Sequence, residues 1–400
     1  MVLSPLTPSN RADLPSGCRP LGGSSSQVSL RRQLKIWRQP ALKADLLLVL
    51  GGTRTAEWPG ISAAGSTPVA RRFTALADAE LLLRGPGVQR HWPLPELPAG
   101  VSPALLSRVV VESLGLAPVV VALGLLRAPD FAHLRIESAV EGPSSCLSGG
   151  CAMSAERVQR LWRQGQRFGA RLRAPLVLAE CVPGGTTTAQ AVLTGLGMSV
   201  AELVSGSALQ PPQALKSRLV REGLERAGLM GESALPSAVL AAVGDPFQAL
   251  AAGLLVGAAA SRQPVLIGGG SQMVAVLALA LMALRKEQRQ QLSEQVMIGT
   301  TAWLADEAGA PQAASMFSRL VDVASDHCGV ALQAMACGVR LGVSRHQQLR
   351  DYELGYVKEG VGAGALLLLA QLQGLSVAEL VDRCDQAMDA LHGKTVGSAS

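Results

Sequence analysis

Aromatic residues are scarce in this chain: phenylalanine, tryptophan and tyrosine together make up 3% of its 400 residues. Charged residues are also few, at 16%, whereas hydrophobic residues reach 48%. The core must therefore consist mainly of leucine, valine and alanine, a composition that suits helices packed on a parallel sheet. The length exceeds that of a usual single domain, so we expect one large domain or two coupled domains.

No segment combines basic and aromatic residues in the way that nucleic-acid-binding modules do. The formal net charge is +6, and basic residues gather in two places, residues 11–38 and residues 157–173. The second set falls on and just after a predicted helix, and we interpret it as a solvated face. The composition thus favours an anionic small molecule over nucleic acid as a partner.

The cysteines and histidines lack the spacing of a metal site. The seven cysteines form no CxxC pair, and the five histidines are dispersed along the chain. The N-terminus has no continuous apolar segment of the kind found in signal peptides. We therefore expect reduced thiols, a cytoplasmic protein and no bound metal.

Long hydrophobic runs are also missing. The most apolar stretches are residues 273–284 and 365–374. Both are shorter than the roughly 20 residues that a membrane-spanning helix needs. We expect two buried helices and no membrane partner.

Strand and helix patterns alternate after the first 38 residues, which are rich in Pro, Gly, Ser and Arg and read as a flexible arm. Such alternation predicts an α/β fold: an open, mostly parallel sheet with helices on both faces, in a Rossmann-like three-layer arrangement. The expected strands lie within 44–53, 117–126, 174–180, 264–270 and 294–304, and the expected helices within 102–115, 153–172, 208–243, 245–263, 273–284 and most of the chain after about residue 311.

Three of these strands run into glycine-rich turns, at residues 50–52, 183–185 and 268–270. In open parallel sheets, ligands bind outside the carboxyl ends of the strands. The three turns are therefore expected at one edge, where they could share one site.

The segment "AECVPGGTTTAQAVLTGLG" (179–197) is the most informative of these turns. Glu180 ends a buried strand, Gly184 and Gly185 let backbone N–H groups approach a ligand, and Thr186, Thr187 and Thr188 open a helix. A phosphate suits such a place because the helix start is electropositive. A strand–turn–helix junction capped by threonine, with no ligand, is equally compatible with the spacing.

A second carboxylate stands between glycines in "VKEGVGAGALLLL" (357–369), where Glu359 precedes Gly360, Gly362 and an apolar helix. Taken alone, this pattern is typical of a solvated glutamate near a helix start.

Taken together, the motifs resemble the nicotinate-nucleotide:dimethylbenzimidazole phosphoribosyltransferase family of cobalamin lower-ligand synthesis. The similarity covers roughly residues 44–390 in the same order. It comprises the strand ending in Glu180 with its glycine–threonine turn, the helix opened by Asp245 and Pro246, the Glu359 element, and "GISAAG" (60–65) with Ser62.

The resemblance implies transfer of the 5-phosphoribosyl group of nicotinate mononucleotide to a benzimidazole or purine-like base. Glu359 would be the general base, with Gly360 and Gly362 beside it, and Ser62 would contact the acceptor. Residues 184–188 would hold the phosphate, and Glu180 would bind ribose hydroxyls or stiffen the turn. Nicotinate leaves from a pyridinium, so the reaction requires no general acid, metal or cofactor.

Family analogy also implies a homodimer. It divides the chain into the arm (1–38), an α/β domain (39–345) and a C-terminal segment (346–400), which completes the site and a smaller helical domain built from both chain ends.

The sequence departs from the family pattern at three places. "GGTRT" (51–55) replaces the family's Asp-His-Gly, Gly185 replaces an asparagine, and Lys358 replaces the glycine before the base. These departures predict a divergent branch, whose acceptor can differ from dimethylbenzimidazole. A kinase or nucleotide hydrolase, and a non-catalytic nucleotide-binding protein on the same scaffold, remain alternative hypotheses.

Overall fold

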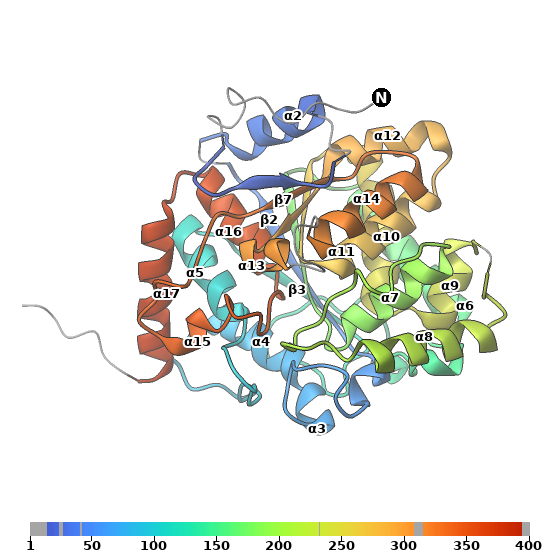
Figure 1. The fold of residues 1–400 in the computed structure, drawn as a ribbon, viewed down its shortest axis with the longest axis horizontal. Coiled ribbons are helices and arrows are strands. Elements are labelled where there is room, and N and C mark those ends of the chain that lie inside the picture. The colour runs from blue at the N-terminus through green and yellow to red at the C-terminus, as the bar shows by residue number, and fades with distance from the viewer. Residues whose placement is uncertain (1–13, 24–26, 41, 232, 308–314, 394–400) are drawn as a thin grey trace, which may run out of the picture.

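A sheet of seven strands crosses the middle of the molecule, with helices on both sides (Figure 1). The computed structural model describes residues 14–23, 27–40, 42–231, 233–307 and 315–393. The sheet order is β1-β7-β6-β5-β4-β2-β3, and only the β1–β7 pair is antiparallel. The strands are β1 Arg19–Leu21, β2 Asp45–Gly51, β3 Pro118–Leu123, β4 Leu176–Cys181, β5 Val265–Gly268, β6 Val296–Thr300 and β7 Gln333–Ala336. The predicted α/β fold with a mostly parallel sheet is confirmed.

The first face of the sheet is covered by helices from both ends of the chain. Alternate residues of β2, Leu46, Leu48 and Leu50, pack into this core because successive strand side chains point to opposite faces. The layer comprises α2 Gln27–Trp37, α4 Thr74–Arg84, α5 Ala104–Leu114, α16 Ala363–Leu372 and α17 Val377–Leu391. The separate C-terminal unit expected from residue 346 stays a prediction. Its two long helices, α16 and α17, pack in the same layer as helices from the N-terminal part of the chain.

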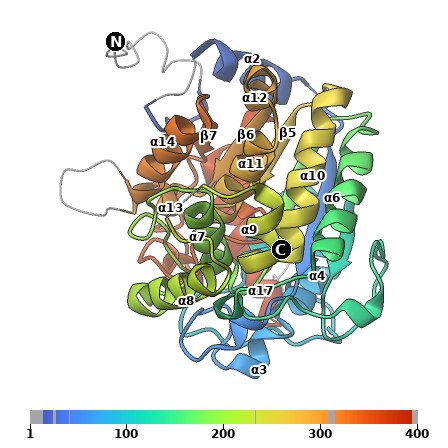
Figure 2. The same cartoon turned by 90° about the vertical axis from the view of Figure 1, so that its right-hand side faces the viewer.

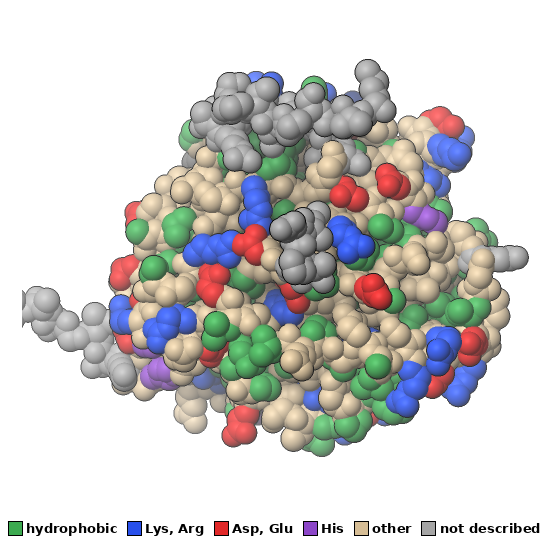
Figure 3. Space-filling view, in the orientation of Figure 1, with side chains coloured by type: hydrophobic (Ala, Val, Ile, Leu, Met, Phe, Trp, Pro, Cys, Tyr) green, Lys and Arg blue, Asp and Glu red, His purple; other side chains and the backbone are tan. Residues whose placement is uncertain are grey.

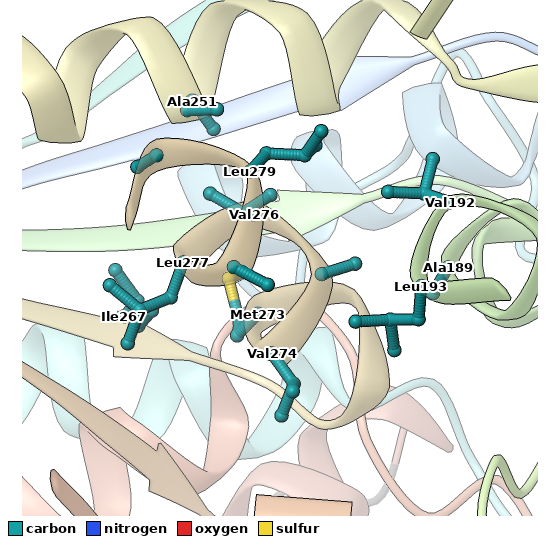
Figure 4. Close-up of a cluster of buried hydrophobic side chains, with 14 of the residues drawn as sticks. Ala189, Val192, Leu193, Ala251, Ile267, Met273, Val274, Val276, Leu277 and Leu279 are labelled. Carbon is teal, nitrogen blue, oxygen red and sulfur yellow. The ribbon is translucent and has the colours of Figure 1, made fainter. Parts of the chain in front are cut away.

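The opposite face receives Leu47 and Val49 of β2. Its helices α6 and α10 run side by side (Figure 2), where glycines allow the two backbones to approach closely. α11 is apolar all round and lies buried against α7 through Met273, Val276 and Val192 (Figure 4). The layer comprises α6 Ala155–Gly169, α7 Gly185–Gly195, α8 Gln213–Arg226, α9 Pro236–Val243, α10 Pro246–Ser261, α11 Ser271–Met282, α12 Lys286–Gln295 and α14 Met316–Cys328.

Short elements connect these layers. They are α3 Pro68–Arg71, α13 Ala302–Asp306, α15 Gln347–Arg350 and three 3-10 turns, Arg54–Glu57, Ala139–Glu141 and Leu147–Gly149.

The prediction of a flexible arm is wrong for residues 19–21 and 27–37, which form β1 and α2. Residues 1–13 lie outside the described residues. Helix α2 is held by Leu30, Leu34 and Trp37, which recur every three or four residues and are buried. This apolar stripe is hidden in the sequence among arginines, serines and glutamines.

One further detail differs from prediction. β7 lies in a region expected to be helical, because its Gln, Ala and Met residues prefer helices and only its place beside β6 makes it a strand. Helix α5 spans Ala104–Leu114 within the predicted range 102–115, and its N-cap is Pro103. Ser102 accepts the Ala104 N–H.

No helix in the described residues is long and apolar enough to cross a membrane. On the face shown in Figure 3, acidic and basic side chains are interspersed. The two apolar stretches 273–284 and 365–374 fall on α11 and α16, whose side chains are buried as predicted.

Candidate active site

A cavity of about 330 Å³ lies beside the carboxyl end of β4. β4 and β2 are neighbours at the point where the strand order reverses, the usual ligand site of open α/β sheets. Residues from distant parts of the chain line the cavity. They include Ser62, Asp78, Ser102, Glu180, Gly184, Gly185, Thr186, Ser205, Ser207, Gly270, Gln272, Glu307, Lys358, Glu359 and Gly360.

The turn after β4 forms one wall of this cavity. Gly184 is the N-cap of α7, and its φ of 82° lies in the left-handed region that glycine adopts readily. The N–H groups of Gly185 and Thr187 donate to Val182 O and Gly184 O. Thr186 lies between them on the first turn and lines the cavity, so the electropositive end of α7 faces this space.

A buried polar network supports the turn from below. Asp245 caps α10 and accepts hydrogen bonds from the Thr188 hydroxyl at 2.6 Å and from Gln272 Nε2 at 2.9 Å. Gln248 donates to Gln272 Oε1 at 2.7 Å. A Cβ on Gly185 would lie 2.7 Å from Gln272 Nε2, so the network also requires a glycine in the turn.

Glu180 is the last strand residue but one of β4, and its side chain projects on the face of α7 and α10. Its Oε2 atom is buried without a hydrogen-bond partner in the described residues. Burial raises the pKa of this carboxyl to about 8, and the negative charges of Asp245, Glu359 and Asp78 add to the effect. The group is therefore mostly neutral at pH 7.

Glu359 faces the same cavity from the loop before α16. Its carboxylate accepts hydrogen bonds from the N–H groups of Thr301, Gly360 and Gly364 at 3.1–3.2 Å. These bonds stabilise the charged form, but burial outweighs them and raises the pKa to about 7. Such a carboxylate is matched to accepting a proton near neutral pH.

The loop that carries Glu359 has an unusual backbone. Val357, Lys358 and Val361 have φ of 63°, 62° and 52°, in the left-handed region that non-glycine residues rarely adopt. Long-range hydrogen bonds hold them: Thr301 Oγ1 and Trp303 Nε1 donate to Lys358 O. The Val361 N–H donates to Glu180 O, which joins the two glutamate segments directly.

Ser62 lies in a loop at the other side of the cavity. The Ser62 and Ser207 hydroxyls are 3.3 Å apart, and the Ser207 Oγ accepts the Ala63 N–H. Arg71 is buried and donates to four backbone carbonyls of residues 56–65, which fixes the loop.

The cavity brings together most of the residues singled out from the sequence. Thr187, Thr188 and Gly362 do not line it. The Thr188 hydroxyl is directed to Asp245, and Gly362 lies where a Cβ would come within 2.7 Å of Ala179 Cβ. These three residues support the walls and do not face the space between them.

The expectation that three glycine turns share one site is wrong for residues 50–52. Gly270 lines the main cavity together with the 183–185 turn, but Gly51 and Gly52 line a separate small cavity of about 20 Å³. A Cβ on Gly52 would lie 2.0 Å from Gly124 O. This glycine therefore permits packing between backbones and does not serve the main cavity.

Sequence reasoning missed several polar residues of the site. Asp78 is buried, accepts hydrogen bonds from Ser102 Oγ and Cys181 Sγ, and has its pKa raised to about 6 by burial. Its signal was a carboxylate inside the apolar helix "TALADAELLLR". Ser205, Ser207 and Glu307 lie in segments with no distinctive local pattern.

Comparisons with known proteins agree with this geometry. A phosphoribosyltransferase family model matches residues 106–309. UPF0284 proteins of Parasynechococcus marenigrum and Prochlorococcus marinus (strain MIT 9313) are each 56% identical to the chain, over 98% and 95% of it and 99% and 94% of their own lengths. The crystal structure of CobT from Thermus thermophilus shares the fold, with a TM-score of 0.57 at 18% identity over 92% of each chain. A structure titled nicotinate-nucleotide-dimethylbenzimidazole phosphoribosyltransferase, from the same organism, has a TM-score of 0.57 at 17% identity, over 94% of this chain and 96% of its own.

The matched family model defines the class of protein as a pentosyltransferase, an enzyme that transfers a pentose phosphate. The chain belongs to the CobT-like phosphoribosyltransferase family, and the two UPF0284 proteins above are similar to it over nearly their full lengths.

Proposed function

We propose that the protein transfers the 5-phosphoribosyl group from nicotinate mononucleotide to a nitrogen of a benzimidazole or purine-like base. The observation that carries the proposal is the meeting of Glu180, Glu359 and the glycine–threonine turn over one cavity. A solved structure of the same fold is titled as the enzyme that uses dimethylbenzimidazole. The products would be nicotinate and an α-ribazole phosphate-type nucleotide for the lower ligand of cobalamin.

Glu359 acts as the general base in this proposal. The acceptor nitrogen attacks C1′ of the ribose while its N–H proton passes to the Glu359 carboxylate. The C1′–nitrogen bond to nicotinate breaks, and its electron pair neutralises the pyridinium nitrogen. A base of this kind contributes about 10²–10⁴-fold, and its pKa of about 7 suits proton transfer at neutral pH.

The opposite wall holds the donor. The first turn of α7, with Thr186, binds the 5′-phosphate through N–H and hydroxyl groups. Glu180 has an unpartnered Oε2 atom and is mostly neutral at pH 7, so it can exchange hydrogen bonds with a ribose hydroxyl. Holding donor and acceptor in line makes the displacement effectively unimolecular, which supplies the larger part of the rate.

The test is to incubate the purified full chain with nicotinate mononucleotide and a panel of benzimidazoles and purines. Nicotinate release that depends on one added base supports the proposal and identifies the acceptor. ATP with Mg²⁺ forms a second arm. Turnover of ATP without base-dependent nicotinate release would contradict the proposal and favour a kinase or hydrolase.

The homodimer implied by the family resemblance and the cytoplasmic location expected from the reduced thiols belong to this proposal too. Light scattering of the purified full chain measures the oligomeric state directly. A monomer at the concentrations used for activity would contradict the dimer without affecting the proposed reaction.

A further inference from the structure

The ionisable side chains around the cavity are mostly acidic. Four carboxyl side chains line it, from Asp78, Glu180, Glu307 and Glu359. Among the described residues, Lys358 is the only lysine or arginine that does so. A phosphorylated substrate brings about two more negative charges, so a cation that meets it has a large effect on its affinity.

The Lys358 ammonium lies toward the wall formed by the turn after β4, which carries Thr186. Its Nζ donates to Ser205 Oγ at 3.0 Å and to Glu307 Oε1 at 2.6 Å. The residue after Ser205 is Gly206, on which a Cβ would lie 3.9 Å from Thr186 Oγ1. An ammonium has three N–H donors and two are used here, so one is left for a ligand oxygen in the cavity.

A second lysine lies behind the same segment. Lys216 is fully buried, does not line the cavity, and donates to Val204 O and Ser205 O at 3.0 and 2.8 Å. Burial, and next the charge of Lys358, lower the pKa of Lys216 to about 7. Lys216 thus fixes the 204–205 backbone from inside, while Lys358, ion-paired with Glu307, lines the cavity.

The backbone conformation at Lys358 is fixed by hydrogen bonds from distant residues. Its left-handed conformation is held by the Thr301 and Trp303 side chains, which bond its carbonyl oxygen. Lys358 also stands where the resemblance places a glycine in the family pattern, so its charge is a departure of this chain from that pattern.

We propose that Lys358 binds the 5′-phosphate of the donor and makes this protein select a nucleotide over a nucleoside. The proposal rests on the proposed function for the identity of the donor. Phosphate contact and general base then come from adjacent residues, Lys358 and Glu359, on one loop.

The first test measures binding without catalysis. Ribose 5-phosphate is titrated calorimetrically into the wild-type protein, Lys358→Met and Lys358→Arg, with Lys286→Met on exposed α12 as the control. Loss of one charged hydrogen bond predicts about 10- to 100-fold weaker binding to Lys358→Met, partial rescue by arginine and no change in the control. Equal binding by wild type and a folded Lys358→Met, or no binding by wild type, would overturn the proposal.

The second test uses turnover. For Lys358→Met, the KM of nicotinate mononucleotide is expected to rise about 10- to 100-fold, while the KM of nicotinate riboside, which lacks the phosphate, stays unchanged. An equal rise for both donors would overturn the role in phosphate selection. Lys358-dependent binding of ribose 5-phosphate without any transfer would instead refute only the proposed reaction.

Discussion

The two walls of the cavity are held in different ways. The turn at residues 182–186 places glycine at its one left-handed position, Gly184, and its hydrogen bonds are local. The glutamate loop has left-handed valine and lysine residues, each costing on the order of 1–2 kcal/mol. Its conformation depends on Thr301, Trp303 and the carbonyl of Glu180, which are distant in sequence.

This difference separates binding from chemistry. Local hydrogen bonds set the backbone of the turn and the Asp245 network only supports it, which suits a group that holds the donor. A loop held by distant contacts places Glu359 only when β4, β6 and α16 are assembled around it. Changes in the turn should therefore act mainly on KM. Changes that displace Glu359 should act mainly on kcat, while the Lys358 side chain is the loop's own contribution to binding.

The largest effect is expected from Glu359→Gln, which keeps the size of the side chain and removes the base. With the acceptor heterocycle that the panel identifies, we expect kcat to fall by about 10²–10⁴. The Kd of nicotinate mononucleotide should change little. Single-turnover nicotinate release and calorimetric binding measure the two quantities. Glu287→Gln, on exposed α12, is the control. Full activity in Glu359→Gln would mean that another group takes the proton.

The pH profile of kcat/KM should show the titration of one carboxyl group from each wall, Glu359 and Glu180. Glu359 must be ionised to accept a proton, so kcat/KM should rise about tenfold per pH unit toward its pKa of about 7. Glu180 loses its proton near pH 8, after which a second negative charge faces the donor and activity should fall. Glu180→Gln is permanently neutral and should keep the rising limb but lose the falling one. A profile flat from pH 5 to 7 would contradict the base assignment.

Trp303→Phe tests whether the loop depends on its distant partners. The variant keeps an aromatic ring but removes the N–H that bonds Lys358 O at 2.5 Å. Lys358 O keeps its hydrogen bond from Thr301 Oγ1, so the variant loses one hydrogen bond, worth about 0.5–1.5 kcal/mol. We expect kcat to fall about tenfold because Glu359 is displaced, the KM of the nucleotide to rise because Lys358 shifts with it, and the Tm to fall.

Trp162→Phe, on α6 across the sheet, is the matched control and should leave kcat unaltered. Loss of stability without loss of kcat in Trp303→Phe would show that the loop keeps its shape through Thr301 alone.

The contrast between the locally bonded turn and the loop held by distant contacts also explains how much of the site the sequence predicts. The turn was predictable because strand, glycines and threonines are contiguous, and each signals its own conformation. The closeness of Glu180 and Glu359 followed only from the family resemblance, since nearly half of the chain separates them. The left-handed valines carry no local signal, because valine ordinarily avoids that conformation.

The missed strands have a related cause. β1 has three residues and β7 has four, too few for a periodic pattern, and both become strands because β6 offers an edge on which β7 and then β1 can pair. Gly52 was wrongly expected at the ligand site for a related reason. Its contact with Gly124 arises because the two strands that they follow are neighbours in the sheet. Local patterns predicted the sheet and the turn, whereas pairings between distant segments were beyond them.

The smallest effect is expected on the binding wall, from Thr186→Val. Valine preserves the shape of the side chain and removes one hydroxyl from the cavity, while the Thr188–Asp245 bond that supports the turn stays intact. One hydrogen bond to a charged phosphate predicts about a 10-fold rise in the KM of nicotinate mononucleotide with kcat unaltered. Thr194→Val, at the far end of α7, is the control, since its hydroxyl bonds only Gln190 O of the same helix. If Thr186→Val lowered kcat and left KM unchanged, the turn would belong to the chemistry, and the division of labour between the two walls would be wrong.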